Sequence, residues 1–256
     1  MCLILLATDH HPRWRLVVAA NRDEFFARPT APAGWWDDAP FVLAGCDLKD
    51  GGTWMGITRA GRFAAVTNYR EPENYRVGAP SRGHLVGNFL RSRAAPEGYL
   101  RGLARLADQY NGFNLLVGDS RDLAYFSNRA EGAWRLGPGV YGLSNHLLDT
   151  PWPKVARGKE DLRAALEGPE EELEGALFAT LALRDPAPDA ELPRTGVGAE
   201  RERALSAAFI STPEYGTRAS TVLLVGHGGE VRMTERTTVP GENRWTEVRH
   251  EFRLEE

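Results

Sequence analysis

The sequence predicts an α+β protein in which two stacked antiparallel sheets are sandwiched by helices. Short apolar segments bounded by turn residues fill the first part of the chain and its last fifth. Between residues 153 and 210 the apolar residues recur at helical spacing instead. Runs of strands that alternate with runs of helices are typical of this class, and strand hairpins at both ends of the chain suit it.

The N-terminal hairpin is the first element of this fold. Residues 2–8 are apolar and predict a buried strand. A turn at 9–12 leads to residues 14–20, whose β-branched and aromatic side chains predict an antiparallel partner strand. This second strand runs directly into the tetrad Asn21-Arg22-Asp23-Glu24, and the proline-rich stretch 28–40 after it is expected to be a loop.

The remaining elements follow from the spacing of apolar residues between turns. Further strands are expected at residues 41–45, 53–58, 62–68, 113–118, 123–127, 133–136, 140–143, 220–226, 231–238 and 244–253. Helices are expected at residues 82–93, 96–110, 154–166, 170–183 and 200–210. Ser81 is the expected N-cap of the first helix. We predict a single domain over residues 1–256, with only a weak signal for a boundary near Thr150.

Composition excludes several classes of protein. The chain has 256 residues, 42% of them hydrophobic, and a net charge of −4, which is ordinary for a globular protein. No basic cluster interleaves with aromatic residues, which argues against nucleic-acid binding. No apolar run reaches the ~18 residues that span a membrane, and no signal sequence opens the chain. We therefore expect a cytoplasmic protein with a small-molecule partner and no membrane partner, and leave a homo-oligomer open.

Cys2 is the first candidate for chemistry. An initiator Met before a residue as small as cysteine is normally removed, which would leave a thiol and a free α-amine on one residue. The amine titrates at about 8 and the thiol at about 8.5 in model peptides. One residue can then supply both the nucleophile and its general base. The alternative is that Cys2 is a small apolar residue of the first strand.

Polar residues at the ends of apolar strands are the other candidates. Arg22 can favour a thiolate, and the Asp23 carboxylate can orient an α-ammonium. Asn68 and Asn145 carry amides that can bind an oxyanion. Arg218, just before the strand at 220–226, can reach a carboxylate or the nucleophile. Each of these residues has an alternative explanation. Arg22 and Asp23 can lie at a hairpin end in solvent, Asn68 and Asn145 can be turn residues, and Arg218 can lie on the surface.

Histidine and the second cysteine give weaker signals. The six histidines fit no metal-ligand spacing, and two cysteines form no zinc quartet, so we expect neither a metal nor another cofactor. A pair of Cys2 or Cys46 with His84 or His146 remains an alternative way to activate a thiol. We interpret Cys46 as a structural thiol.

Together, several motifs resemble the Asn-Arg-Asp-Glu family, which includes the eukaryotic transport and Golgi organisation protein 2. The resemblance covers the whole chain. The motifs that carry it are Met1-Cys2, Asn21-Arg22-Asp23-Glu24-Phe25, Arg28-Pro29-Thr30, Gly51-Gly52-Thr53-Trp54-Met55-Gly56, Thr67-Asn68-Tyr69-Arg70, Ser81-Arg82-Gly83, Tyr110-Asn111-Gly112-Phe113-Asn114-Leu115 and Gly142-Leu143-Ser144-Asn145.

This family in turn resembles the N-terminal-nucleophile hydrolases, which implies a four-layer αββα fold. Among these hydrolases, the proteins that the family resembles most in mechanism are the cysteine amidases that cleave bile-salt conjugates and penicillin V. By position, the resemblance implies catalytic roles for Cys2, Arg22, Asp23, Asn68, Asn145 and Arg218. We further expect Asn21, Glu24, Trp54 and Tyr69 to contact substrate.

One departure from the amidases affects the tetrad. The amidases separate their arginine and aspartate by two residues, whereas Arg22 and Asp23 are adjacent. Adjacent side chains on a strand point to opposite faces, so which tetrad members enter the site stays open.

The resemblance implies a hydrolase of a non-peptide amide, or of a thioester, with Cys2 as nucleophile once Met1 is removed. The alternative is a non-catalytic carrier of a hydrophobic small molecule such as haem or an acyl conjugate. Trp35, Trp36, Trp54, Phe25 and Phe26 would then line its pocket, although core packing is the more common use of such side chains and is expected for most of them.

Overall fold

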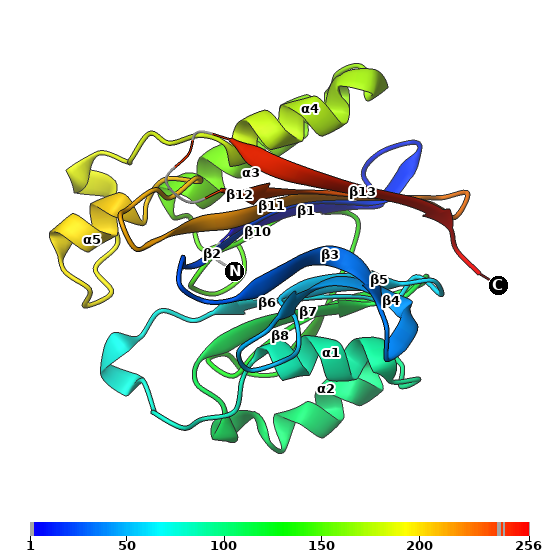
Figure 1. The fold of residues 1–256 in the computed structure, drawn as a ribbon, viewed down its shortest axis with the longest axis horizontal. Coiled ribbons are helices and arrows are strands. Elements are labelled where there is room, and N and C mark those ends of the chain that lie inside the picture. The colour runs from blue at the N-terminus through cyan, green and yellow to red at the C-terminus, as the bar shows by residue number, and fades with distance from the viewer. Residues whose placement is uncertain (1–2, 240–241, 243, 256) are drawn as a thin grey trace. The chain divides into compact units, whose positions relative to one another are not determined.

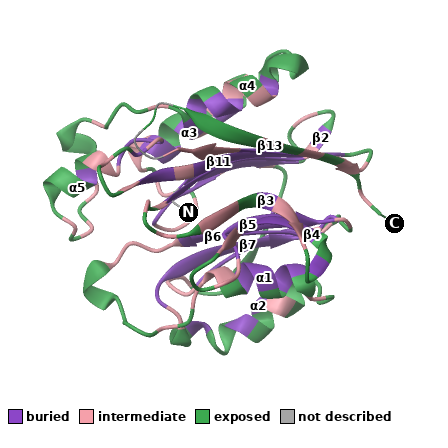
Figure 2. Cartoon of the chain, in the orientation of Figure 1, coloured by how far each residue is buried: buried purple, intermediate pink, exposed green. Residues whose placement is uncertain are grey.

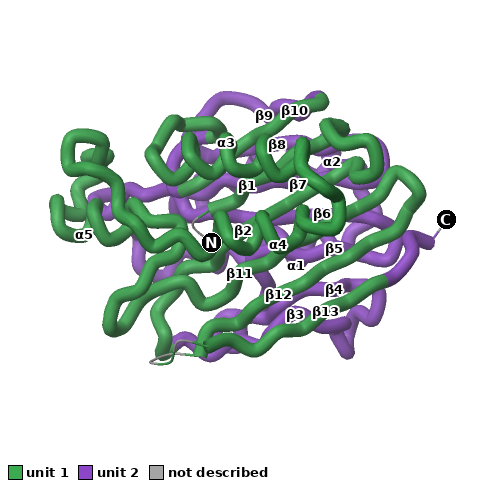
Figure 3. The backbone as a smooth tube through the Cα atoms, turned by 90° about the horizontal axis from the view of Figure 1, so that it is seen from above, with its two compact units in different colours: residues 1–27, 138–144, 148–251 green, residues 28–137, 145–147, 252–256 purple. Residues whose placement is uncertain are grey.

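A computed structural model of the chain describes residues 3–239, 242 and 244–255. Cys2, the predicted nucleophile, therefore lies outside the described residues. The described chain forms two compact units, each built from separate stretches of sequence (Figure 3). The first comprises residues 1–27, 138–144 and 148–251, and the second residues 28–137, 145–147 and 252–256. The single domain expected from the sequence stays a prediction.

The first unit is built on a six-stranded antiparallel sheet (Figure 1). Its strand order is β10-β1-β2-β11-β12-β13. The strands are β1 (Leu3–Thr8), β2 (Trp14–Phe25), β10 (Gly139–Leu143), β11 (Tyr215–Gly226), β12 (Glu230–Thr238) and β13 (Trp245–Arg253). Its helices are α3 (Pro153–Glu167), α4 (Glu170–Leu181), α5 (Ala199–Ala204) and the 3₁₀ turn η3 (Asp189–Glu191).

Helices α3 and α4 cover one face of this sheet. Because side chains alternate along a strand, every second residue of the central strands faces the helices. These residues form one buried apolar cluster with the helices, and it includes Leu3, Leu5, Val17, Ala19, Val222, Leu224, Leu162, Leu177 and Leu181. The central strands are buried almost throughout their length (Figure 2).

The second unit contains a seven-stranded antiparallel sheet whose strands follow chain order, β3 to β9. They are β3 (Thr30–Trp36), β4 (Ala39–Asp47), β5 (Met55–Thr58), β6 (Phe63–Asn68), β7 (Phe113–Gly118), β8 (Leu123–Ser127) and β9 (Ala133–Leu136). Helices α1 (Gly83–Arg91) and α2 (Pro96–Ala104) pack on this sheet, and η1 (Pro72–Asn74) and η2 (Ala107–Gln109) are short 3₁₀ turns. Phe89, Phe113 and Leu115 belong to the buried cluster between the helices and the sheet.

The predicted α+β class, with antiparallel sheets that carry helices, is confirmed, and so is the N-terminal hairpin. Two expectations were wrong. The second strand does not stop at residue 20: β11 pairs with β2 as far as Phe25, so the tetrad forms the last part of the strand. The stretch 28–40 is not all loop: it contains β3, an edge strand whose register breaks between Ala31 and Gly34, where Pro32 is tolerated.

Two predicted helices are also shorter than expected. The helix predicted at 200–210 ends at Ala204, and the one predicted at 96–110 ends at Ala104, with η2 after it. None of the described helices combines the length and the apolar character needed to cross a membrane.

Candidate active site

In the first unit, the tetrad extends β2 beyond the first described residue of β1. Leu3 is paired with Asn21, and Ile4 with Ala20 on one side and Leu143 on the other. Residues 22–24 therefore continue along β2 past the point where the described part of β1 begins.

The Asn21 side chain points toward the helices and is fully buried. Its amide nitrogen donates to the carbonyls of Leu181 and Ala208, both at 2.8 Å, and its oxygen accepts from the Ser220 hydroxyl at 2.6 Å. Both amide hydrogens are thus used inside the unit. In the structure Asn21 therefore connects β2 to α4 and to the segment before β11. The substrate contact expected from the sequence stays a prediction.

Asp23 lies on the same face of β2 as Asn21, whereas Arg22 lies on the opposite face. Asp23 is opposite Thr217 of β11, and Arg22 is opposite Ala219. The Thr217 hydroxyl donates to Asp23 Oδ1 at 2.6 Å. Oδ2 of the same carboxylate is buried and has no hydrogen-bond partner among the described residues. A buried carboxylate oxygen without a partner is costly, so this atom marks a place where a cation or donor is expected.

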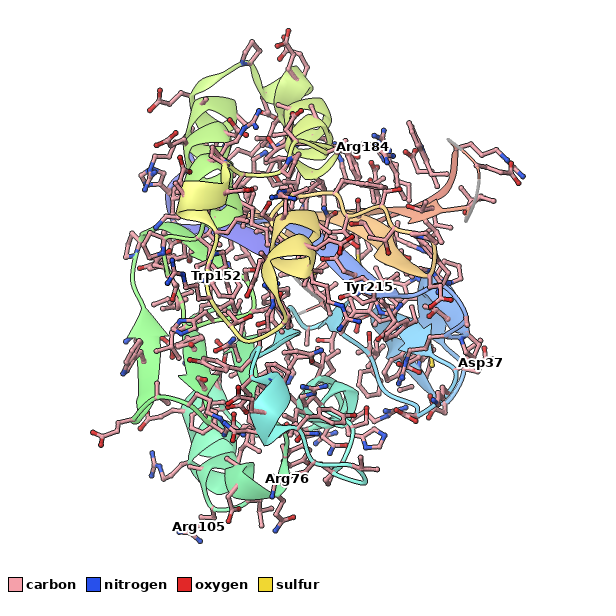
Figure 4. The ribbon with its side chains drawn as sticks, turned by 90° about the vertical axis from the view of Figure 1, so that its left-hand side faces the viewer. Asp37, Arg76, Arg105, Trp152, Arg184 and Tyr215 are labelled. Carbon is pink, nitrogen blue, oxygen red and sulfur yellow. The ribbon has the colours of Figure 1, made fainter. Side chains whose placement is uncertain are left out.

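Arg218 occupies a bulge of β11, between the residues paired with Asp23 and Arg22. Its Nη1 donates to the carbonyls of Phe25 and Phe26 at 3.0 and 2.9 Å, so it caps the end of β2. Burial lowers the pKa of this guanidinium, and Glu24 acts in the opposite direction. Tyr215, labelled in Figure 4, begins β11 and packs edge-on against Phe25, with ring centroids 5.2 Å apart.

In the second unit, the two predicted oxyanion donors lie together. Asn68 is the last residue of β6. Asn145 Nδ2 donates to the Asn68 carbonyl at 3.0 Å, and the Arg70 main chain donates to the Asn145 carbonyl at 2.7 Å. Arg70 Nη2 also donates to Asn145 Oδ1 at 3.2 Å. Asn145 is therefore held in place by the segment that follows β6.

Tyr69 and His146 form a pair beside these asparagines. The Tyr69 hydroxyl and His146 Nε2 are 2.8 Å apart, and the two rings lie 4.8 Å apart. Burial raises the pKa of Tyr69, with a further contribution from the charge of Glu71. Burial also lowers the pKa of His146, so its imidazole is neutral at neutral pH.

Trp54 and Cys46 are packed within the second unit. Trp54 is 5% exposed, and its six-membered ring fills the space above Gly45, where a Cβ would lie 2.2 Å from the indole. Trp54 therefore has a packing role here. Burial raises the pKa of the Cys46 thiol, as do the charges of Asp47 and Asp38, so this cysteine is a poor nucleophile at neutral pH.

Within residues 3–239, 242 and 244–255, no group of three or more His, Cys, Asp or Glu side chains is arranged to hold a metal ion. Sequence reasoning missed Thr217 and the bond between Tyr69 and His146. Neither carries a local signal, because each depends on a pairing between distant segments.

Comparison with known proteins places the chain in a family. The family model described as "Transport and Golgi organisation 2" matches residues 1–240. The chain belongs to the transport and Golgi organisation 2 family. It is 40% identical to the Bos taurus transport and Golgi organization protein 2 homolog over 276 residues, and 36% identical to the Homo sapiens homolog; each alignment covers all of both chains.

Among solved structures, the family member resembles a Caenorhabditis elegans N-acylethanolamine-hydrolyzing acid amidase ortholog. The TM-score is 0.50 at 10% sequence identity, over 87% of this chain and 92% of that one. At this identity the likeness concerns the fold alone, and in that respect it agrees with the fold class predicted from the sequence.

Proposed function

We propose that this family member is an N-terminal-nucleophile cysteine hydrolase that cleaves an amide other than a peptide bond, or a thioester, of a small molecule in the cytoplasm. Removal of Met1 would make Cys2 the nucleophile. The observation that carries the proposal is the Asp23 carboxylate, buried at 4% exposure, with one oxygen bonded to Thr217 and the other without a partner among the described residues. Asp23 comes two residues after Asn21 on β2. Asn21 pairs with Leu3, which directly follows Cys2 in the chain.

Asp23 and Arg22 suit the two reactive groups of an N-terminal cysteine. The α-amine belongs to the main chain and the thiol to the side chain, so each needs its own partner. Asp23 would hold the α-ammonium that forms when the amine takes the thiol proton, and Arg22, on the other face of β2, would favour the thiolate. Arg218 would add positive charge at the end of this strand. No metal or cofactor takes part in this chemistry.

Asn68 and Asn145 would stabilise the oxyanion. The Asn145 amide is held against the Asn68 main-chain carbonyl at the end of β6, and Arg70 Nη2 donates to its oxygen. A preorganised amide donor of this kind contributes about 3 kcal/mol to transition-state stabilisation. The worm protein of similar fold is named for hydrolysis of N-acylethanolamine, so small acyl amides are the first substrates to assay.

The test needs no known substrate at its first stage. Intact-mass measurement should show loss of Met1, and iodoacetamide at neutral pH should label Cys2 well before Cys46, whose raised pKa makes it an internal reference. Retention of Met1, or equal labelling of the two thiols, would overturn the proposal.

A screen of acyl amides and thioesters follows, with Cys2→Ala as the inactive variant and Cys46→Ala as its matched control. We expect turnover that is lost in Cys2→Ala and kept in Cys46→Ala. A Cys2→Ala variant that binds ligand and functions like the native chain would favour a carrier instead.

A further inference from the structure

Thr217 of β11, which lies opposite Asp23, is packed closely against the segment at residues 210–211. Thr217 is fully buried, and its main chain donates to the Ile210 carbonyl at 2.8 Å. The preceding residue, Gly216, forms an isolated bridge with Ser211. A Cβ at position 216 would lie 2.5 Å from the Ile210 carbonyl oxygen. Only glycine therefore lets the 210–211 segment approach β11 this closely.

This approach determines where the Thr217 hydroxyl proton points. The main-chain N–H of Ile210 donates to Thr217 Oγ1 at 2.9 Å, so the oxygen acts as an acceptor there. A hydroxyl has a single hydrogen, and the Asp23 Oδ1 atom at 2.6 Å is the acceptor that remains for it. A separation of 2.6 Å is typical of a hydroxyl that donates to a charged carboxylate.

We propose that Thr217 is a positioning residue that fixes the Asp23 carboxylate by its Oδ1 atom and leaves Oδ2 for the α-ammonium of Cys2. This role rests on the proposed function. It also explains why one oxygen of a buried carboxylate is bonded within the protein while the other is not. Without the Thr217 hydroxyl, the carboxylate is free to turn, and the ammonium–thiolate form of Cys2 loses its stabilising partner.

The experiment is the pH profile of Cys2 carboxymethylation by iodoacetamide in the full chain. In Thr217→Val, which keeps the shape of the side chain but not its hydroxyl, we expect labelling at neutral pH to slow about tenfold, equivalent to about 1.4 kcal/mol. The profile should move to higher pH, because less of the thiol is ionised. Thr217→Ser retains the hydroxyl and should label like the native chain.

Two further variants separate positioning from packing. Thr234 of β12 is a second buried threonine of this sheet, and its hydroxyl has no partner among the described residues. Thr234→Val should therefore leave labelling unchanged. In an Asp23→Asn background, Thr217→Val should have little additional effect, because the two residues act through one contact.

The outcomes distinguish the two proposals. A native Cys2 that keeps Met1 or labels no faster than Cys46 overturns the hydrolase proposal and the role of Thr217 with it. A reactive native Cys2 with an unchanged profile in Thr217→Val overturns the role of Thr217 alone. The role of Thr217 is also overturned if Cys2 is labelled as slowly in Thr217→Ser as in Thr217→Val. It is likewise overturned if Thr217→Val slows labelling as much in the Asp23→Asn background as in the native chain.

Discussion

Replacement of Asn21 by alanine should destabilise the fold strongly, because this amide joins three separate segments. Its hydrogen bonds reach the Leu181 carbonyl at the end of α4, the Ala208 carbonyl and the Ser220 hydroxyl of β11, at 2.6–2.8 Å. The site is fully buried. Alanine would leave two carbonyls and one hydroxyl without this partner.

The magnitude follows from those three groups. Each buried polar group that loses its partner costs about 1–3 kcal/mol. A water molecule that enters the small cavity would recover part of this, so we take the lower half of the range and expect Asn21→Ala to lower the free energy of unfolding by about 3–5 kcal/mol. This is a large share of the roughly 5–15 kcal/mol that stabilises a typical domain.

Urea unfolding followed by circular dichroism measures this loss. Asn74 offers a matched control, because it is exposed and its side chain makes one long hydrogen bond, 3.3 Å, to Glu71. Asn74→Ala should change the free energy of unfolding by less than about 0.5 kcal/mol. A loss below about 1 kcal/mol in Asn21→Ala would refute the reasoning.

Three further variants test other parts of the structure. Gly216→Ala should lower the unfolding free energy by about 1–3 kcal/mol, because a Cβ would meet the Ile210 carbonyl at 2.5 Å; an unchanged urea midpoint would contradict this. Gly175→Ala, in α4 with open space around the new Cβ, should instead be stabilising by about 0.5–1 kcal/mol, since alanine favours the helix; a lower midpoint would count against it. Burial lowers the pKa of His146 from 6.5, so the unfolded chain binds more protons between that value and the lower folded pKa. The stability that His146 contributes is therefore present above about pH 6.5 and is lost as pH falls. The urea midpoints measured at pH 7.5 and at pH 5.5 should differ less in His146→Gln than in the native chain. An equal difference in both proteins would show that His146 does not cause this pH dependence of stability.

The sequence was sufficient for much of the fold and for the family. Hydrophobic periodicity is a local property, so the strands of the N-terminal hairpin and the positions of α3 and α4 could be predicted from it. Motifs such as the tetrad and Thr67-Asn68-Tyr69-Arg70 were enough to indicate the family. Residues that are close in sequence, such as Arg22 and Asp23, could also be named as candidates for one site.

Only the tertiary structure decided which way these side chains point and what they contact. β2 continues to Phe25 because β11 pairs with it, and that pairing fixes Asn21 and Asp23 on one face and Arg22 on the other. The bond from Thr217 to Asp23 joins residues 194 positions apart in the chain. Periodicity shows which residues alternate within a strand, but only the pairing with a distant strand decides which residues each side chain contacts.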